Sequence, residues 1–164
     1  MELQEIMETT GLKIRHQNPP EDITENIAKF IIRNYENDCC LWCKSIDKNG
    51  DLYSSKYTHP IEVKAFTSNG PLQFGPNKKF DVLYFLDLRK CMNEDKIVLW
   101  KVNLSNDCLD MKCVKISKRQ TYDDQCKEKR RPHISWDKLY PQITKHCIQI
   151  YENTFENIFI PQGK

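Results

Sequence analysis

Residues 80–88 constrain the fold of this chain more than any other stretch of its sequence. They read FDVLYFLDL and include five consecutive apolar residues, 82–86. A strand this apolar, without alternating polar positions, is typical of the centre of a sheet that is covered on both faces. The whole chain has 164 residues, close to the roughly 150 residues of an average domain. We therefore predict a single α/β domain over residues 1–164.

The other elements follow from apolar periodicity and from turn residues. Apolar residues at helical spacing predict a helix over 22–36, which Asp22 would cap together with Glu25 three residues later. The turn signal at 47–50 predicts a hairpin. The hairpin strands are expected over 41–46 and from Asp51, and further strands over 61–66, 97–104 and 112–117. A Gly- and Pro-rich loop is expected over 67–79 and an arm or helix over 1–17. Helical segments are expected over 120–130 and over 135–151, the second interrupted at Pro141.

Charge and hydropathy exclude several classes of protein. The net charge of +2 excludes a histone-like polycation, so nucleic-acid binding must come from local basic patches. The first ten residues carry three acids and no basic segment followed by an apolar one, so no signal peptide is expected. The apolar run 82–86 is far shorter than the roughly 20 residues of a membrane span. We therefore expect a soluble, cytoplasmic protein with no membrane partner.

The eight cysteines are interpreted as buried apolar side chains. Cytosolic thiols stay reduced, so a disulfide framework is not expected. Cys40 and Cys43 form a CxxC pair, but the chain lacks the second tight pair that a zinc ribbon needs. A non-catalytic module that binds zinc through Cys40, Cys43, Cys108 and Cys113 is kept as an alternative.

The candidate chemistry lies in one of three acid-x-Lys pairs. Glu62 and Lys64 are two residues apart in the expected strand 61–66, so both project from the same face. Asp51 stands at the start of the preceding short strand, and two adjacent strands can bring Asp51 and Glu62 to one cation. Mg²⁺ binds through one or two carboxylates together with waters and phosphate oxygens. Lys64 could then orient or deprotonate a water molecule. The other two pairs are less suitable. Glu94/Lys96 lies in a polar stretch expected to be a loop, and Asp110/Lys112 has no acid placed before it across a hairpin.

These residues resemble a known superfamily. The blocks Gly50-Asp51-Leu52 and Ile61-Glu62-Val63-Lys64, after a helix that carries Glu25, resemble the PD-(D/E)xK nucleases. The stretch 66–76, FTSNGPLQFGP, followed by the strand from Phe80, is similar to small type II restriction endonucleases that cut short palindromic DNA. The segment 129–133 fits the same group, and the similarity covers residues 19–140.

The resemblance implies both a fold and a set of site residues. The fold would be a restriction-endonuclease-like central mixed β-sheet flanked by helices. Asp51 and Glu62 would be the metal-binding carboxylates, Lys64 the catalytic lysine and Glu25 an accessory catalytic acid. Gly50 stands where the motif has proline, a departure that many members of the superfamily share.

The resemblance also places part of the chain near DNA. Arg130 and Arg131 are the best candidates for base recognition, because a guanidinium group can pair with guanine through two hydrogen bonds. Lysines beside such a site would contact phosphates. The residues expected at the DNA are Ser68, Asn69, Gln73, Lys78, Lys79, Arg130, Arg131 and His133.

Together these features predict a Mg²⁺-dependent type II restriction endonuclease. Cleavage of both strands of a palindrome calls for two active sites related by a twofold axis, so a homodimer on double-stranded DNA is expected. A cognate DNA methyltransferase is expected in the same system. The alternatives are a nuclease of the same fold that acts in DNA repair or recombination, and the zinc-binding module described above.

Overall fold

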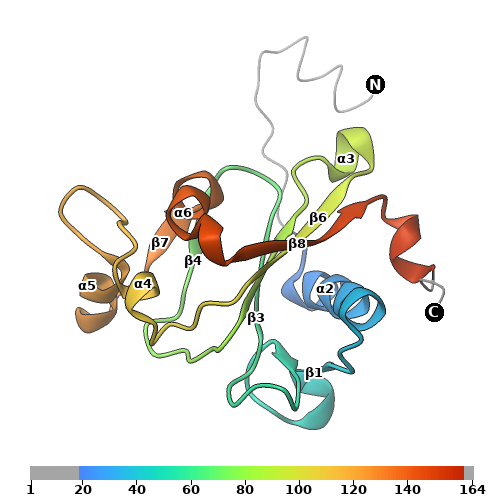
Figure 1. The fold of residues 1–164 in the computed structure, drawn as a ribbon, viewed down its shortest axis with the longest axis horizontal. Coiled ribbons are helices and arrows are strands. Elements are labelled where there is room, and N and C mark those ends of the chain that lie inside the picture. Colours follow the sequence, from blue (N-terminus) through green and yellow to red (C-terminus); the bar gives the residue numbers. More distant parts are fainter. Residues whose placement is uncertain (1–18, 161–164) are drawn as a thin grey trace.

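A four-stranded mixed sheet forms the centre of the fold, with α2 on one side and α6 on the other (Figure 1). The neighbouring strands β3 and β5 are parallel, and the other neighbours are antiparallel. The computed structural model describes residues 19–160, so the expected arm or helix over 1–17 lies outside the described residues. In spatial order the sheet is β3 (Glu62–Phe66), β5 (Leu83–Asp87), β6 (Ile97–Val102) and β8 (Cys147–Asn153), and the two helices are α2 (Glu21–Glu36) and α6 (Trp136–Ile143).

Strand β5 is buried on both faces, as its sequence predicts. Tyr84 and Leu86 belong to the core cluster beneath α2, and Leu83 and Phe85 belong to the cluster beneath α6. All four side chains are fully buried. Because successive residues of a strand point to opposite faces, a strand with a core on each side has no polar alternation. The central position of this strand and the α/β class are therefore confirmed.

Helix α2 starts one residue before the predicted helix, but the predicted cap is wrong. The backbone N–H groups of Ile23 and Thr24 bond to the carbonyl oxygen of Pro20, which occupies the N-cap position. Among residues 19–160, the Asp22 carboxylate accepts a hydrogen bond only from the adjacent Ile23 N–H. Proline favours the start of a helix. In the helix that begins after Pro20, the Glu25 side chain points into the protein interior, where the residue is 6% exposed.

Two short ribbons border the sheet. The predicted hairpin is present as β1 (Leu41–Trp42) paired with β2 (Leu52–Tyr53). Its first strand stops at Trp42, because residues 43–46 form the 3₁₀ helix η1 (Cys43–Ile46) instead of continuing as strand. The second ribbon pairs β4 (Pro71–Gln73) with β7 (His133–Ser135). It was not predicted, because β4 is only three residues long and lies inside the loop 67–79.

Two further predictions were wrong. The strand expected over 112–117 is replaced by the end of a short helix and a single bridge between Lys115 and Thr121. The helix expected over 135–151 continues past Pro141 only as far as Ile143. Residues 144–146 form a 3₁₀ helix, and the segment from Cys147 becomes the edge strand β8. The remaining elements are α3 (Cys91–Glu94), α4 (Leu109–Lys112), α5 (Tyr122–Lys127), η2 (Thr144–His146) and η3 (Glu156–Phe159).

Strand β3 is an outer strand of the four-stranded sheet, at the edge opposite β8. An antiparallel bridge between Leu52 and Ile61 joins the hairpin to the start of β3. Within residues 19–160 no helix combines the length and apolar character needed to cross a bilayer.

Candidate active site

Glu62 and Lys64 project from the same face of β3, as the period of two predicts. The Lys64 Nζ atom lies 2.5 Å from Glu62 Oε1. The Glu62 side chain is only 2% exposed, whereas that of Lys64 is 20% exposed. This face is covered because Phe74, just beyond β4, packs beside it, with its ring centroid 5.7 Å from Lys64 Nζ. The pair is therefore a buried acid with a lysine that reaches toward solvent.

Asp51 lies beside this pair, as the expected hairpin geometry requires. The backbone N–H of Val63 donates to Asp51 Oδ2 at 2.8 Å, so β3 itself fixes the carboxylate. Asp51 is 8% exposed. The bridge between Leu52 and Ile61 sets the register that brings Asp51 opposite the start of β3.

Gly50 precedes Asp51 because the backbone there permits no side chain. Its φ is +119°, a value that L-residues with a side chain rarely adopt. A Cβ atom at this position would lie 2.5 Å from Pro60 Cβ and 2.8 Å from Pro60 Cγ. Glycine in place of the motif's proline is thus a structural requirement of this hairpin.

Lys78 joins the two acids, a contact that the sequence analysis missed. Its Nζ atom lies 2.8 Å from Asp51 Oδ1 and 2.5 Å from Glu62 Oε2. Burial alone would lower the pKa of Lys78, but the nearby carboxylates of Glu62 and Asp51 outweigh it and the pKa is raised. Lys78 is therefore held as an ammonium ion between the two carboxylates.

Glu25 faces the same site from α2. The Trp42 Nε1–H group donates to Glu25 Oε2 at 2.5 Å. Burial raises the pKa of Glu25, with a smaller contribution in the same direction from Asp51, while the hydrogen bond from Trp42 opposes the shift. Trp42 therefore orients this carboxyl group.

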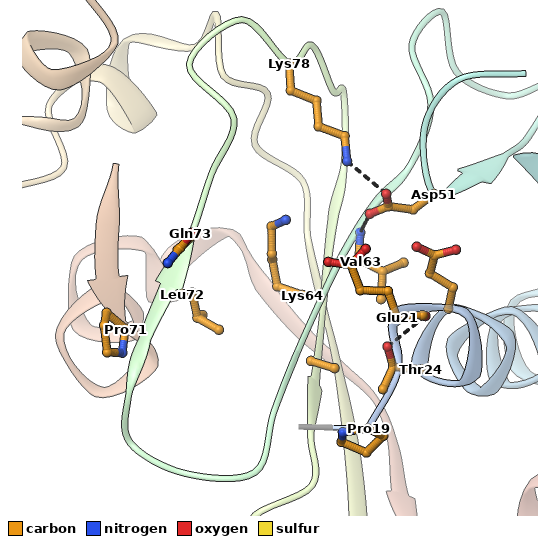
Figure 2. Close-up of a pocket in the computed structure, with 12 residues that line it drawn as sticks. Pro19, Glu21, Thr24, Asp51, Val63, Lys64, Pro71, Leu72, Gln73 and Lys78 are labelled. Atoms are coloured by element: carbon orange, nitrogen blue, oxygen red, sulfur yellow. Dashed lines mark hydrogen bonds and ion pairs between the residues drawn. The ribbon is translucent and has the colours of Figure 1, made fainter. Parts of the chain in front are cut away.

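Glu25, Asp51, Lys64 and Lys78 line one cavity of about 410 Å³, whereas the buried Glu62 is not part of its lining. Figure 2 shows Lys78 extending toward Asp51 from the loop beyond β4, while Lys64 rises from β3 into the space between β3 and β4. Gln73 lines the wall formed by β4. The cavity thus combines carboxylates, ammonium groups and an amide at one edge of the sheet. Its lining includes Glu25, Asp51, Lys64, Gln73 and Lys78.

The acid pair fits a divalent metal ion. Glu62 Oε1 is buried and accepts no hydrogen bond within residues 19–160, apart from its ion-pair contact with Lys64. Glu62 Oε2 and Asp51 Oδ1 already share one cationic atom, the Lys78 Nζ. Hard oxygen ligands of this kind suit Mg²⁺, which needs only one or two carboxylates because waters and phosphate oxygens complete its shell.

The cysteines do not form the alternative zinc site. In the part of the chain that the structure describes, no three His, Cys, Asp or Glu side chains are grouped so as to hold a metal ion. Cys40 is in the core cluster beneath α2, whereas Cys108 packs against the cluster beneath α6. Burial raises the pKa of Cys40 to about 12, so its thiol stays protonated and is a poor ligand. The zinc-module alternative is wrong, because the fold separates its proposed ligands.

Some of the expected DNA-contacting residues lie beside the cavity and others do not. Gln73 on β4 is the register partner of His133 on β7, so the ribbon presents both side chains together. Ser68 and Asn69 follow the far end of β3, and the Asn69 side chain accepts a hydrogen bond from Arg89 Nη1 at 2.6 Å.

The expected basic residues are exposed, apart from the partly buried Lys78. Lys79 follows Lys78 in the same loop, and Arg131 leads into β7. Arg130 is held by Gln120 at 2.8 Å and by Glu128 at 2.7 Å. Such exposed pairs contribute little to stability, so these side chains are free to exchange their partners for phosphates.

A mixed sheet whose edge strand carries an acid-x-Lys pair beside a second carboxylate defines this chain as a restriction-endonuclease-like protein. The model of the Bsp6I restriction endonuclease family matches residues 1–143, and the chain belongs to that family. The type II restriction enzyme Bsp6I of Bacillus sp. (strain RFL6) is 36% identical over 89 residues, which cover 52% of this chain. The aligned segment spans 48% of that relative's own length. No solved structure matches the chain.

His59, in the segment before β3, is hydrogen-bonded to Asp81 through contacts whose strength depends on pH. His59 donates its backbone N–H to Asp81 Oδ2 at 2.8 Å, and its Nδ1 lies 2.9 Å from Asp81 Oδ1. Burial alone would raise the pKa of Asp81, but these hydrogen bonds outweigh it, so the pKa is lowered from 3.8. A carboxyl group with a lowered pKa stabilises the fold above its unfolded pKa, and this stabilisation is lost as the pH falls through the folded pKa.

We therefore expect Asp81→Asn to reduce the free energy of unfolding by about 1 kcal/mol at neutral pH. The difference from the wild-type protein should shrink as the pH falls below 3.8, the ordinary pKa of an aspartate, through the lowered pKa of Asp81. Urea denaturation at neutral pH and at the lower pH measures the difference in the free energy of unfolding. The control is Asp107→Asn, which changes an exposed aspartate. A difference that is independent of pH would contradict the assignment of the shift to the His59 contacts.

Proposed function

We propose that this chain is a divalent-metal-dependent, type II restriction endonuclease that hydrolyses phosphodiester bonds of double-stranded DNA at a short palindromic site. The observation that carries the proposal is the convergence of Asp51 and Glu62 on one cationic atom, the Lys78 Nζ, while Lys64 contacts Glu62 and lines the cavity. Membership of a family of restriction endonucleases supports the same reaction.

Asp51 and Glu62 would hold the metal ion, for which we propose Mg²⁺. When bound, such an ion supplies Lewis-acid stabilisation of the negative charge that develops on the scissile phosphate. The backbone of Val63 keeps the Asp51 carboxylate in place through its hydrogen bond to Oδ2, so Oδ1, which contacts Lys78 Nζ in this structure, is the oxygen that would bind the ion.

Lys64 would act on the attacking water. Its ammonium group enters the cavity beside Glu62 and is partly exposed, so a water molecule and a phosphate can both reach it. From there it orients the water for attack on phosphorus and stabilises the charge on the phosphate. Glu25, fixed by Trp42, would be an accessory acid that accepts or donates a proton at the same cavity.

The β4–β7 ribbon is proposed as the DNA-facing element. A two-stranded ribbon fits the major groove of B-DNA, and this one carries Gln73 and His133 next to the cavity. Arg130 and Arg131 lead into the same ribbon and would contact bases or phosphates. Lys78 and Lys79 would contribute phosphate contacts at the opposite rim, and Ser68 and Asn69 would contact DNA beyond the end of β3.

A palindromic site also implies further partners. Two copies related by a twofold axis would place one cavity at each strand, so we propose a homodimer on DNA. Protection of the host genome would require a DNA methyltransferase that modifies the same site.

The test is a cleavage assay on several unmethylated plasmids, with Mg²⁺ and with EDTA. We expect discrete fragments with Mg²⁺ and intact plasmid with EDTA, because metal removal takes away the charge stabilisation at the phosphate. Mapping the fragment ends gives the recognition site. A smear of fragments would instead favour a repair or recombination nuclease of the same fold. Intact DNA under all conditions, on substrates that together contain all short palindromes, would contradict the proposal.

A further inference from the structure

The Lys78 side chain stands where a metal ion would have to bind. Its Nζ contacts one oxygen of Asp51 at 2.8 Å and one of Glu62 at 2.5 Å. These acids come from two different elements, the hairpin and β3, so Lys78 links them across the site. A divalent cation held by the same two acids would compete with the ammonium group for their oxygens, and it would be repelled by an ammonium group that stayed in contact with them.

The backbone of Lys78 is anchored, which makes this placement specific. The Lys78 N–H donates to the Gly75 carbonyl oxygen at 3.3 Å, closing a turn. The Lys78 carbonyl oxygen accepts a hydrogen bond from the Asn106 side chain. Only the side chain is left to move, and it is 35% exposed at the rim of the cavity. A change of rotamer therefore takes the ammonium group from the acids into the cavity without moving the loop.

The two buried acids have two cationic partners while Lys78 is present. Asp51 and Glu62 face two ammonium groups, Lys64 and Lys78, and Glu25 adds a third acid at the same cavity. Burying carboxylates without a counter-ion is strongly unfavourable. A metal ion bound to the two acids would supply the positive charge instead of Lys78. The contact of Lys78 with the acids is therefore needed only when no metal ion is bound.

We propose that Lys78 is a built-in counter-ion of the metal site, which holds Asp51 and Glu62 together before metal binding and competes with the metal for them. The inference rests on the proposed function, because it takes the two acids to be the metal ligands. It makes Lys78 a positioning residue that sets the metal affinity, in addition to the phosphate contact proposed above. Loss of the lysine charge should therefore tighten metal binding, whereas loss of a phosphate contact would weaken only DNA binding.

The test compares Mn²⁺ binding by the DNA-free wild-type protein, Lys78→Gln and Lys79→Gln, by electron paramagnetic resonance or calorimetry. Lys79→Gln is the matched control because it removes the same charge from the same loop. The Lys79 side chain is exposed and does not line the cavity. We expect Lys78→Gln to lower the Kd for Mn²⁺ by about tenfold or more, since charge-assisted hydrogen bonds to two acids no longer compete. The Kd of Lys79→Gln should stay close to that of the wild type. A Kd of Lys78→Gln equal to or weaker than wild type overturns the inference.

Thermal melts in EDTA and in Mn²⁺ provide a second readout. Without metal, Lys78→Gln should melt at a lower temperature than the wild type. Mn²⁺ should raise the Tm of Lys78→Gln by more than it raises the Tm of the wild type. Lys78→Arg keeps the charge and should bind Mn²⁺ much as the wild type does. If Lys78→Gln is unfolded in EDTA, Mn²⁺ should refold it as judged by circular dichroism, and failure to refold would contradict the inference.

The outcomes also separate the two proposals. A wild-type protein that binds Mn²⁺ no better than Asp51→Asn contradicts both the metal site and the role of Lys78. A wild-type protein that binds Mn²⁺ and cleaves DNA, with no tighter binding in Lys78→Gln, contradicts the counter-ion role alone.

Discussion

Replacing Lys64 by methionine is expected to lower the rate of Mg²⁺-dependent DNA cleavage by about 10³-fold, because a positioned acid–base group commonly contributes a factor of this order. Methionine has a similar length and keeps the apolar packing beside Phe74, while it removes the ammonium group that lies 2.5 Å from Glu62 Oε1. The Lys64 side chain is partly exposed, so the fold should survive its replacement. Single-turnover cleavage of a mapped plasmid site measures the effect.

The control for this variant is another acid-x-Lys pair in the same chain. Lys112→Met alters the pair Asp110/Lys112 in α4, where Asp110 is held instead by Lys145 and His146. This variant should cleave at the wild-type rate. Circular dichroism and thermal melts should show both variants folded. Near wild-type cleavage by folded Lys64→Met would contradict the assignment of Lys64, as would equal losses in the two variants.

The core of the fold could be predicted because its signal is local. The apolar run at β5 follows from burial on both faces, and the helix α2 follows from its amphipathic spacing. Strand β8 could not be predicted in this way. Of its seven residues only Tyr151 is buried, so the strand lacks an alternating pattern, and its pairing with β6 decides its conformation.

The candidate site shows the same division between local and long-range information. Glu62 and Lys64 share a face by the period of a strand, and the turn at 47–50 brings Asp51 back beside them. The contact of Lys78 with Asp51 spans 27 residues and depends on the course of a loop, so no local pattern carries it. Glu25 matched a capping pattern because a capping box and a buried acid on the first turns of a helix look alike in sequence.

Gly50→Ala is expected to reduce both stability and cleavage strongly. The added Cβ would lie 2.5 Å from the Pro60 ring, at a backbone φ of +119°. Proline is rigid, so the hairpin must shift, and the strain and overpacking together should lower the free energy of unfolding by about 3 kcal/mol. Pro60 is followed by Ile61, which pairs with Leu52, so the same shift displaces Asp51 from Glu62. A displacement of about 1 Å at a catalytic group costs on the order of 10²-fold in rate.

Asn49→Ala is the matched control, because it changes the neighbouring exposed residue of the same turn and adds no atom near Pro60. Urea denaturation gives the loss of stability, and cleavage at a temperature where both variants are folded gives the loss of rate. Mn²⁺ affinity separates the two effects, since displaced carboxylates should bind the ion more weakly even in the folded variant. If Gly50→Ala matched Asn49→Ala in stability, rate and Mn²⁺ affinity, the glycine would not be what sets Asp51 against β3. The hydrogen bond from Val63 to Asp51 would then have to hold the carboxylate on its own.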